Sequence, residues 1–590
     1  MWGKPALKSL TRTKKPTIEQ LAGYPSMTGW FKPGLLSKLI LRVIISDIFG
    51  QYADRRLIEA ALDTVSDSEI QTRNDISEIL QKDSNGAVWI DFVADLGDGF
   101  DATYAIAYML GQKNLTVDGK TLPRGGALFM GGDEVYPTAS RDEYNIKMRA
   151  PYQFAFPNQH KSAEHPPIFA IPGNHDWYDG LVNFLAFFAR DKPTSIGNWR
   201  TQQKRSYFAT KLTGQCWLWA IDIALVADMD QPQAEYFVAV AEAMPQGANI
   251  ILCSAEPGWY KTESESYRTL SYAAWIAENA GKALRIPLVL SGDTHHYSRY
   301  SGDDGMQYIT SGGGGAFLHG THSLPQQIQA DWLRNPNEIL SLQTCHPSMD
   351  VSRSLLKGNF AFPFLNYGFS ATLGAIYAMM GYLLSLARTP DLALMLILFA
   401  IFAAGLTSYA GYQEKWNFKV ISISILHSAV HFVAMLELTS LLVQFDSAFW
   451  LFREYGPWWA WLLQLAVPMI AVGGIVAGLI FGGYLFLTCR FADMNHNDAF
   501  SAMRLDTYRH FLRIAILGDQ ITVYPIGLDK TPKRYEWKDN PRSPEDASAA
   551  YFLPPDQFEM HLVEPPIVIS GWKAAPTTDM KHPTELPSKN

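Results

Sequence analysis

Cysteine is scarce in this sequence of 590 residues. Its four cysteines, Cys216, Cys253, Cys345 and Cys489, are scattered and form no CxxC or similar metal-binding spacing. This scarcity argues against a disulfide framework and favours a reducing compartment. The stretch from residue 1 to 20 contains Lys and Arg but lacks the apolar core of a secretory signal. We therefore expect residues 1–365 to lie in the cytoplasm.

Lys and Arg together are also fewer than Asp and Glu. The net charge of −8 gives no indication of a basic face, so nucleic acid is excluded as an expected partner. The mean hydropathy of −0.05 is that of a soluble protein, but it averages two unlike parts. Residues 1–365 have the composition of an ordinary globular protein, whereas 366–489 consist largely of long apolar runs. A chain of this length is expected to contain at least two folding units.

Four apolar segments lie at about 367–387, 391–412, 420–443 and 458–488. Each is long enough to cross a hydrocarbon core of about 30 Å, which predicts an all-α transmembrane domain of four helices over residues 366–489. Lys and Arg are more frequent before the first helix, after the last and in the second connection than in the other connections. The positive-inside rule then places both termini and the soluble domain in the cytoplasm, as in a protein of the bacterial inner membrane or an equivalent membrane.

Glycines and polar residues interrupt these apolar segments. Gly474, Gly478 and Gly482 recur at every fourth position of the last segment, which favours close helix packing. Pro468 in the same segment is a candidate kink. The third segment carries His427, His431 and Glu437. Interhelical hydrogen bonding is the favoured role for these three, and a metal site, a proton path and a lipid headgroup contact are the alternatives.

The soluble part repeats one pattern, in which a short apolar run is followed by a polar cluster. The runs are 88–94, 127–130, 168–171, 249–252, 287–290 and 308–310. Their β-branched and aromatic residues are typical of strands. Residues 217–225 predict a further strand, and 232–243 predict a helix. Strands that end in polar clusters indicate an α/β core with a functional site at the strand ends.

The remaining segments are predicted from composition and periodicity. Residues 1–85 form an N-terminal helical segment, with a helix over 59–80. Within it, 35–49 is too short to span a bilayer, so it is a buried helix or, alternatively, a helix in the membrane interface. Residues 331–365 form a linker. Residues 490–570 form a small α+β C-terminal region in the cytoplasm, with a helix over 499–516 and a strand over 521–526, and 571–590 is a disordered tail.

Four of the polar clusters form an ordered series. They are Asp95-Leu96-Gly97, Gly132-Asp133-Glu134-Val135-Tyr136, Gly173-Asn174-His175-Asp176 and Gly292-Asp293-Thr294-His295. This series resembles the calcineurin-like metallophosphoesterase superfamily, and its DxG and GDxxY spacing resembles the variant found in purple acid phosphatases. The resemblance implies a metallophosphoesterase domain over residues 86–330, built as a two-sheet β-sandwich flanked by helices, with two metal ions at the strand ends.

The resemblance also implies a role for each motif residue. The first metal ion would be bound by Asp95, Asp133, Tyr136 and His295, and the second by Asp133 and Asn174. A carboxylate shared between two ions suits the metal separation used in phosphoryl transfer. His175 would contact the phosphate or protonate the leaving oxygen, and Asp176 would orient His175.

Two departures from the family pattern concern the second metal ion. The family ends its series with GHxH, whereas this chain has Asp293 in place of the first His. The preceding strand ends in a His in the family, but residues 251–257 contain none. Asp293 is favoured as a ligand, whereas Glu256 is favoured as a solvated loop carboxylate. Oxygen ligands shift the expected cofactors toward two manganese or iron ions, with zinc and magnesium as alternatives.

Other polar residues near the motifs remain open. Asp98 and Asp101 add carboxylates close to Asp95 in the chain. His296 can face the opposite side of a strand from His295 and reach substrate or solvent. Residues 312–315 are four glycines that resemble the strand end closing the family's sheet, and cradling a phosphate is an alternative role for them.

Together these features predict a membrane-anchored, metal-dependent phosphoesterase. A hydroxide activated by the metal ions would hydrolyse a phosphate ester. Because four helices exceed what anchoring requires, we expect a lipid or lipid-linked phosphate or pyrophosphate as substrate. The alternative is a pseudoenzyme of the same fold that acts as a membrane-bound ligand-binding or signalling module. A transporter with a regulatory phosphatase domain is a third hypothesis.

Overall fold

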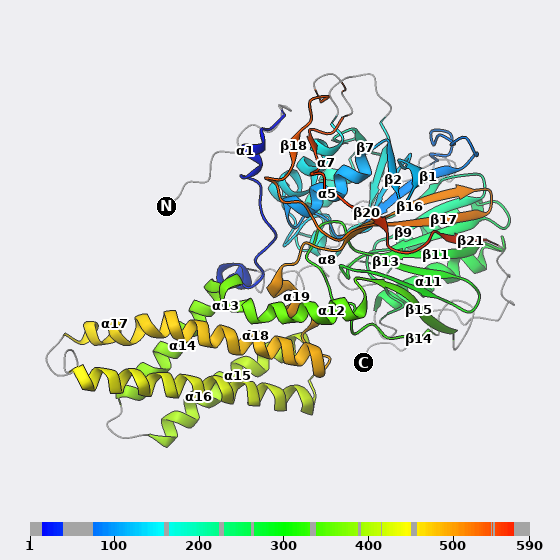
Figure 1. The fold of residues 1–590 in the computed structure, drawn as a ribbon. Coiled ribbons are helices and arrows are strands. Elements are labelled where there is room, and N and C mark those ends of the chain that lie inside the picture. Colours follow the sequence, from blue (N-terminus) through cyan, green and yellow to red (C-terminus); the bar gives the residue numbers. More distant parts are fainter. Residues whose placement is uncertain are drawn as a thin grey trace.

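The structure is a computed structural model. It describes residues 15–38, 75–157, 165–190, 192–223, 229–260, 265–330, 338–386, 391–414, 416–449, 457–543, 546 and 549–570. Within these ranges the chain is a mixed α/β protein with two large sheets, joined to a group of long apolar helices (Figure 1). The predicted α/β class is confirmed. The predicted helices over 39–49 and 59–74 and the predicted disorder of 571–590 concern residues outside the described ranges.

The first sheet contains nine strands in the order β20-β17-β16-β1-β4-β5-β7-β6, and β21 also pairs with β17. Its strands are β1 (Val88–Val93), β4 (Leu128–Met130), β5 (Pro167–Ala170), β6 (Ser195–Ile196), β7 (Trp199–Thr201), β16 (Arg509–Leu517), β17 (Gln520–Leu528), β20 (Met560–Leu562) and β21 (Ile567–Ile569). The neighbours β1, β4 and β5 are parallel and confirm the first three predicted strands. Their carboxyl ends therefore meet at one edge of the sheet.

The second sheet contains eight strands in the order β14-β15-β12-β13-β11-β10-β9-β8. They are β8 (Phe208–Lys211), β9 (Cys216–Ile221), β10 (Asn249–Ser254), β11 (Arg285–Ser291), β12 (Tyr297–Ser301), β13 (Gln307–Ser311), β14 (Gln327–Ala330) and β15 (Glu338–His346). Four adjacent strands, β13, β11, β10 and β9, run parallel. They confirm the strands predicted over 249–252, 287–290 and 308–310 and most of the strand predicted over 217–225.

The two sheets pack face to face. One apolar cluster joins Phe92 and Phe129 of the first sheet to Leu218 and Leu252 of the second. Helices α5 (Phe100–Gly111) and α7 (Ala150–Ala155) cover the outer face of the first sheet. Helices α10 (Gln231–Ala243), which was predicted, and α11 (Glu265–Asn279) cover the second sheet. The result is a sandwich of two sheets between two layers of helices.

The C-terminal region differs from the prediction. Between 492 and 570, α19 (His496–Met503) is the only helix among the described residues, and the second half of the helix predicted over 499–516 is strand β16. This strand pairs with β1 near the middle of the first sheet. Both of its faces are buried, with Leu512 toward the other sheet and Phe511 toward the helices. A strand buried on both faces is a continuous apolar run, which periodicity cannot distinguish from a buried helix. Residues 509–528 thus complete the sandwich instead of forming a separate region.

Two other segments also differ from the prediction. The predicted linker over 331–365 contains β15, which pairs with β12, and continues into α12 (Met349–Leu355), η2 (Leu356–Ala361) and α13 (Phe362–Leu365). In the N-terminal segment, the described residues contain the short helix α1 (Ile18–Leu21) and a helical stretch at 33–38. Residues 75–80 form turns, not the predicted helix, and Asp75 makes a 2.7 Å ion pair with Lys211.

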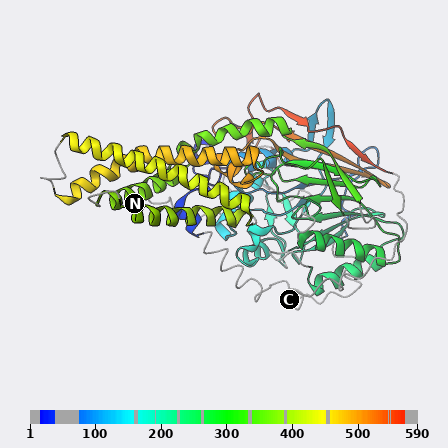
Figure 2. The same cartoon turned by 90° about the horizontal axis from the view of Figure 1, so that it is seen from below.

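Four helices of the described chain are long and apolar enough to cross a membrane, as predicted. They are α14 (Tyr367–Leu386), α15 (Leu392–Gln413), α16 (Phe418–Phe449) and a continuous helix made of α17 (Trp458–Pro468), η3 (Met469–Gly473) and α18 (Gly474–Phe491). The π-helical η3 directly follows Pro468, where a kink was predicted. Two perpendicular views show these helices as an elongated bundle that projects from one side of the sandwich (Figures 1 and 2).

The glycines of α18 allow close packing, as predicted. A Cβ on Gly474 would lie 2.8 Å from the carbonyl oxygen of Ser370, and one on Gly482 would lie 2.1 Å from that of Asn359. The histidines of α16 form a hydrogen-bonded chain. The hydroxyl of Tyr377 on α14 lies 2.6 Å from Nδ1 of His431, and His431 Nε2 lies 2.9 Å from His427 Nε2. Glu437 of α16 is exposed on the outside of the bundle.

Candidate metal centre

Three aspartates follow strand ends that meet at one edge of the sandwich. Asp95 follows β1, Asp133 follows β4 and Asp293 follows β11. All three have backbone φ angles in the left-handed region, at 59°, 55° and 64°. This conformation is costly for residues other than glycine and is found at functional sites where the surrounding fold enforces it. Here it turns each chain sharply at the strand end and brings the carboxylates together.

The phenol of Tyr136 lies at the centre of this group. Its oxygen is 2.8 Å from Asp95 Oδ1, 3.1 Å from Asp133 Oδ2 and 2.9 Å from His295 Nε2. Because His295 Nδ1 lies 2.7 Å from the carbonyl oxygen of Phe317, Nδ1 carries the ring proton and Nε2 presents a lone pair. Three acceptors therefore surround a single phenol proton. Such a concentration of lone pairs is the arrangement that a cation would stabilise.

A second feature of Asp95 also fits a cation. Its other oxygen, Oδ2, is buried without a hydrogen-bond partner among the described residues, a costly situation unless another group binds it. Two glycines make room for this oxygen, because a Cβ on Gly292 or Gly312 would lie 2.5 or 2.6 Å from it. Gly173 does the same for Asp133, since its Cβ would lie 2.1 Å from Oδ1. The glycines of these motifs thus allow backbone to pass close to the carboxylates.

The pKa values of the clustered aspartates also favour a bound cation. Burial raises the pKa of Asp95 well above its usual value, and the neighbouring carboxylate of Asp293 raises it further. Burial and the charges of Asp176 and Asp95 likewise raise the pKa of Asp133. Several carboxylates crowded in a buried space repel one another, and a multivalent cation would remove that repulsion and favour their ionised forms.

His175 lies beside this group and lines the adjoining cavity. Its backbone N–H donates to Asp133 Oδ1 at 2.9 Å, and its Nδ1 donates to the carbonyl oxygen of Pro137 at 2.8 Å. The ring packs between Tyr136 and Trp30, with centroid distances of 4.4 and 5.6 Å. Burial lowers the pKa of His175 to about 4, so the ring is neutral at pH 7.

The contacts of Asp176 are not those expected. Its carboxylate accepts hydrogen bonds from the backbone N–H groups of Gly173 at 3.0 Å and Glu134 at 3.2 Å, and from the hydroxyl of Tyr144. The carbonyl of Pro137, and not Asp176, holds the ring of His175. Asp176 therefore braces the turn that carries Asn174 and His175 against the turn that carries Asp133.

The residues considered for a second metal ion divide into two groups. Asn174 and Asp293 line the same cavity as Asp133 and His295. Glu256 is half-buried, and it is its neighbour Pro257 that lines the cavity. The additional carboxylates near Asp95 make contacts elsewhere. They are Asp98, which accepts from the backbone N–H of Thr28 at 2.9 Å, and Asp101, which forms a 3.1 Å ion pair with Arg534.

The cavity has a volume of about 700 Å³ and joins the aspartate cluster to the membrane helices. One end is formed by Asp133, Asn174, His175, Asp293 and His295. The other walls include Phe369 of α14, Tyr409 of α15, and Phe31 and Leu36 of the N-terminal segment. A cavity of this size, with carboxylates at one end and the apolar side chains of Phe31, Leu36 and Phe369 on part of its walls, is suited to a small amphiphilic molecule.

Sequence reasoning missed several residues of this site. His319 stacks on His295 with ring centroids 3.9 Å apart, and Trp30 covers His175 from the distant N-terminal segment. The guanidinium of Arg509, from a segment expected to be helical, is fully buried and donates to the carbonyl of Ala316. His296 was left open, and it lines the cavity with a buried Nδ1 that has no hydrogen-bond partner among the described residues. The only sequence signal for His319 was its position just after the run of glycines at 312–315.

The ligand atoms of this site limit the metal ions that it can hold. Carboxylate oxygens, a phenol, an amide and an imidazole suit manganese, iron, magnesium or zinc, and the pairing of a phenol with carboxylates favours the harder ions. No family model matches this sequence, and no curated protein does either. The interpretation of the site therefore rests on its residues and their geometry.

Proposed function

We propose that this chain is a membrane-anchored, metal-dependent phosphoesterase. One ion would be held by Asp95, Asp133, Tyr136 and His295, and a second by Asp133, Asn174 and Asp293. The single observation that carries the proposal is the set of three acceptors around the one proton of Tyr136, with the unpaired oxygen of Asp95 beside it. A pair of bound ions would activate water as a nucleophile and neutralise charge on the phosphate.

The other groups of the site have separate roles in this proposal. His175 contacts the bound phosphate from the cavity wall. The negative charge of that phosphate favours the protonated ring, which then donates from Nε2 to a phosphate oxygen or to the leaving oxygen. The Pro137 carbonyl keeps the ring in place through Nδ1. Asp176 acts as a positioning residue through the turn that it braces.

The cavity supports an amphiphilic substrate such as a lipid phosphate or a lipid pyrophosphate. The phosphate would lie against the aspartates, and the apolar part would lie along Phe31, Phe369 and Tyr409 toward the membrane helices. Such a substrate would reach the site from the leaflet nearest the sandwich. By the distribution of Lys and Arg in the sequence, that leaflet is the cytoplasmic one.

The test compares a soluble with a lipid substrate. The full-length protein, purified in detergent or nanodiscs and analysed for metal, is assayed with p-nitrophenyl phosphate and with vesicles containing phosphatidic acid or a polyprenyl diphosphate. Phe369→Ala should reduce turnover of the lipid several-fold and leave p-nitrophenyl phosphate unaffected. Met379→Ala is the matched control, because Met379 lies on the same helix but is exposed on its outer side. Equal loss of both activities, or no turnover of any lipid, would refute the lipid assignment alone.

A second candidate is a pseudoenzyme that binds a phosphorylated ligand without hydrolysing it. The observation in its favour is the absence of both histidines that the resemblance places on the second ion, at position 293 and in residues 251–257. Asp133→Asn separates the two hypotheses. In a phosphoesterase this substitution should abolish turnover and reduce metal content together. Protein that holds no metal and shows no turnover with manganese, iron, zinc or magnesium would support the pseudoenzyme.

A further inference from the structure

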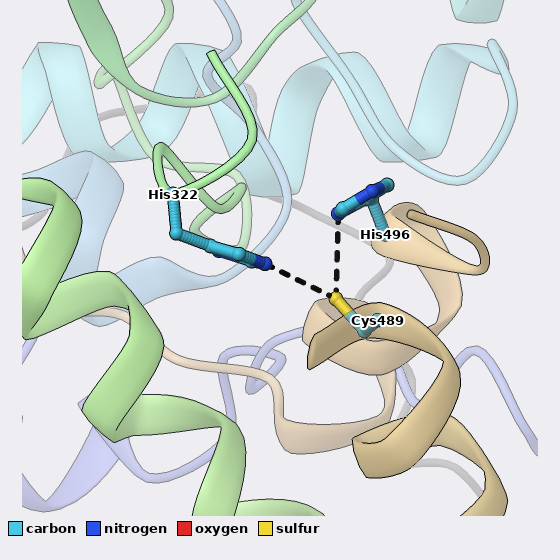
Figure 3. A group of neighbouring side chains, drawn as sticks. All are labelled: His322, Cys489 and His496. Carbon is cyan, nitrogen blue, oxygen red and sulfur yellow. Dashed lines mark hydrogen bonds between the residues drawn. The ribbon is translucent and has the colours of Figure 1, made fainter. Parts of the chain in front are cut away.

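The end of the last membrane helix carries a second group of metal-binding side chains, away from the aspartate cluster. Cys489, in the last turn of α18, faces two imidazoles (Figure 3). Its sulfur lies 3.4 Å from His322 Nε2 and 3.3 Å from His496 Nδ1. The three ligand atoms all lie within 4.8 Å of one another. They come from three separate segments, namely a loop of the sandwich, α18 and the start of α19.

The outer hydrogen bonds orient both rings toward the sulfur. His496 Nε2 lies 2.7 Å from Asp493 Oδ1. An ionised carboxylate only accepts, so Nε2 carries the proton and Nδ1 presents its lone pair to Cys489. His322 Nδ1 lies 2.9 Å from the hydroxyl of Ser352, which also accepts from the backbone N–H of Thr321. When Nδ1 carries the ring proton and donates to that hydroxyl, His322 Nε2 also presents a lone pair to the sulfur.

In that tautomer two nitrogen lone pairs face one thiol, which has a single proton to donate. The thiol can then donate to only one of the two nitrogens, although both lie within hydrogen-bond distance of the sulfur. A thiolate and two neutral imidazoles bound to one cation would satisfy all three atoms. The carboxylate and hydroxyl behind the rings are the partners that orient histidine ligands in metal sites and set their tautomers.

We propose that Cys489, His322 and His496 bind a zinc ion. Around a tetrahedral zinc ion with its usual bond lengths, the sulfur and each nitrogen lie about 3.6 Å apart. The two observed sulfur-to-nitrogen distances, 3.3 and 3.4 Å, are close to this value. One thiolate with two imidazoles is a ligand set that prefers zinc to the hard ions expected at the aspartates. A water molecule would take the fourth position, and Asp493 would balance the charge from behind His496.

The ion would have a structural consequence. It would connect the last turn of α18 to the sandwich loop and to α19, whose residues Asn497 and Asp498 line the cavity. The membrane bundle and the sandwich would thereby be held together next to the candidate active site. The zinc site shares no residue with the aspartate cluster, so it stands or falls independently of the proposed function.

The other cluster of this type within the described residues does not carry the same argument. His346, Asp529 and His561 also lie close together. There the carboxylate is 54% exposed and lies between the two rings, 3.2 Å from His346 and 3.6 Å from His561. A simple ion pair explains that arrangement.

The experiment uses cobalt in place of zinc, because a thiolate bound to cobalt produces a charge-transfer absorption in the near ultraviolet that oxygen and nitrogen ligands do not. The full-length protein is stripped with chelator and reconstituted with cobalt. We expect this band in the wild type and in Asp133→Asn, in which the aspartate site is impaired. Cys489→Ala should lose the band and one zinc ion per chain. Cys216→Ala, which removes another buried free cysteine, should keep both.

A second variant covers the case in which Cys489→Ala fails to fold. His496 is about a third exposed, so His496→Gln is expected to fold and to lose the same zinc ion. In the Asp133→Asn background, chelator should lower the melting temperature of the protein, and this shift should disappear when His496→Gln is added. A wild type without the thiolate band, or equal zinc content in Cys489→Ala, His496→Gln and wild type, would overturn the proposal.

Discussion

The hydroxyl of Tyr136 donates a 2.8 Å hydrogen bond to Oδ1 of Asp95, although the two residues are 41 positions apart in the chain. The same hydroxyl lies within hydrogen-bond distance of Asp133 and His295. Tyr136 therefore contacts residues that follow the ends of β1, β4 and β11 together. Its contacts make it the most direct probe of the aspartate site.

Tyr136→Phe tests whether this phenol is a metal ligand. Phenolate bound to ferric iron absorbs visible light and colours a protein violet, so iron-loaded wild type should be violet and the variant colourless. Loss of a ligand should also lower turnover of p-nitrophenyl phosphate by about 10- to 100-fold. Visible absorption of the two iron-loaded proteins provides the measurement. A colourless iron-loaded wild type would show that Tyr136 does not bind the ion.

His175→Gln separates catalysis from metal binding. The imidazole lines the cavity and packs against Tyr136, but its Nδ1 donates to the Pro137 carbonyl and is therefore not available to bind an ion. We expect turnover to fall by about 10²- to 10³-fold, as for loss of a general acid, while metal content stays at the wild-type level. Steady-state kinetics and metal analysis of the same preparation check both expectations. Metal loss in His175→Gln would instead make this residue a ligand.

The buried ion pair between Asp91 and Arg513 should be essential for joining the C-terminal strands to the sandwich. Arg513 donates to both carboxylate oxygens, at 2.7 and 3.0 Å, and the two side chains are 3% and 0% exposed. Asp91→Ala leaves a buried unpaired cation and should cost about 3 to 5 kcal/mol in the free energy of unfolding. Asp91→Leu combined with Arg513→Met should recover most of this loss. Chemical unfolding of the three proteins gives the comparison, and a double variant as unstable as Asp91→Ala would contradict the explanation.

Glu338 on β15 should make stability depend on pH. Burial and the nearby carboxylates of Asp304 and Asp303 raise its pKa from 4.5 to about 7, and its Oε2 lies 3.5 Å from the hydroxyl of Tyr308. The folded protein holds this proton more tightly than the unfolded chain. The stabilisation of the folded protein that this bound proton provides is complete below pH 4.5 and is lost as the pH rises through 7. Replacing the Glu338 carboxyl with a neutral group should therefore stabilise the protein only above pH 7.

Thermal unfolding across this pH range measures the effect. Glu338→Gln should melt at a higher temperature than wild type above pH 7 and show a weaker dependence on pH between 4.5 and 7. The exposed Glu559→Gln is the control and should follow the wild type. Identical pH profiles for Glu338→Gln and wild type would show that the carboxyl does not titrate in this way.

By itself, the sequence determined the local features of this protein. The four membrane-spanning helices follow from the length of the apolar runs, and the central strands follow from short runs of β-branched and aromatic residues. The polar clusters after those strands marked the edge at which Asp95, Asp133, His175 and His295 meet. The predictions of the helices and central strands succeeded because each depends on residues that are neighbours in the chain.

Only the tertiary structure decided the features that depend on distant residues. Strand β16 could not be distinguished from a helix until its pairing with β1, across 422 positions between Asp91 and Arg513, was known. Likewise, the sequence alone could not show that Trp30 packs on His175 or that Cys489 lies between His322 and His496. The apolar pattern of a segment records that it is buried but not which partner buries it, and the partner determines both the fold of the segment and the chemistry next to it.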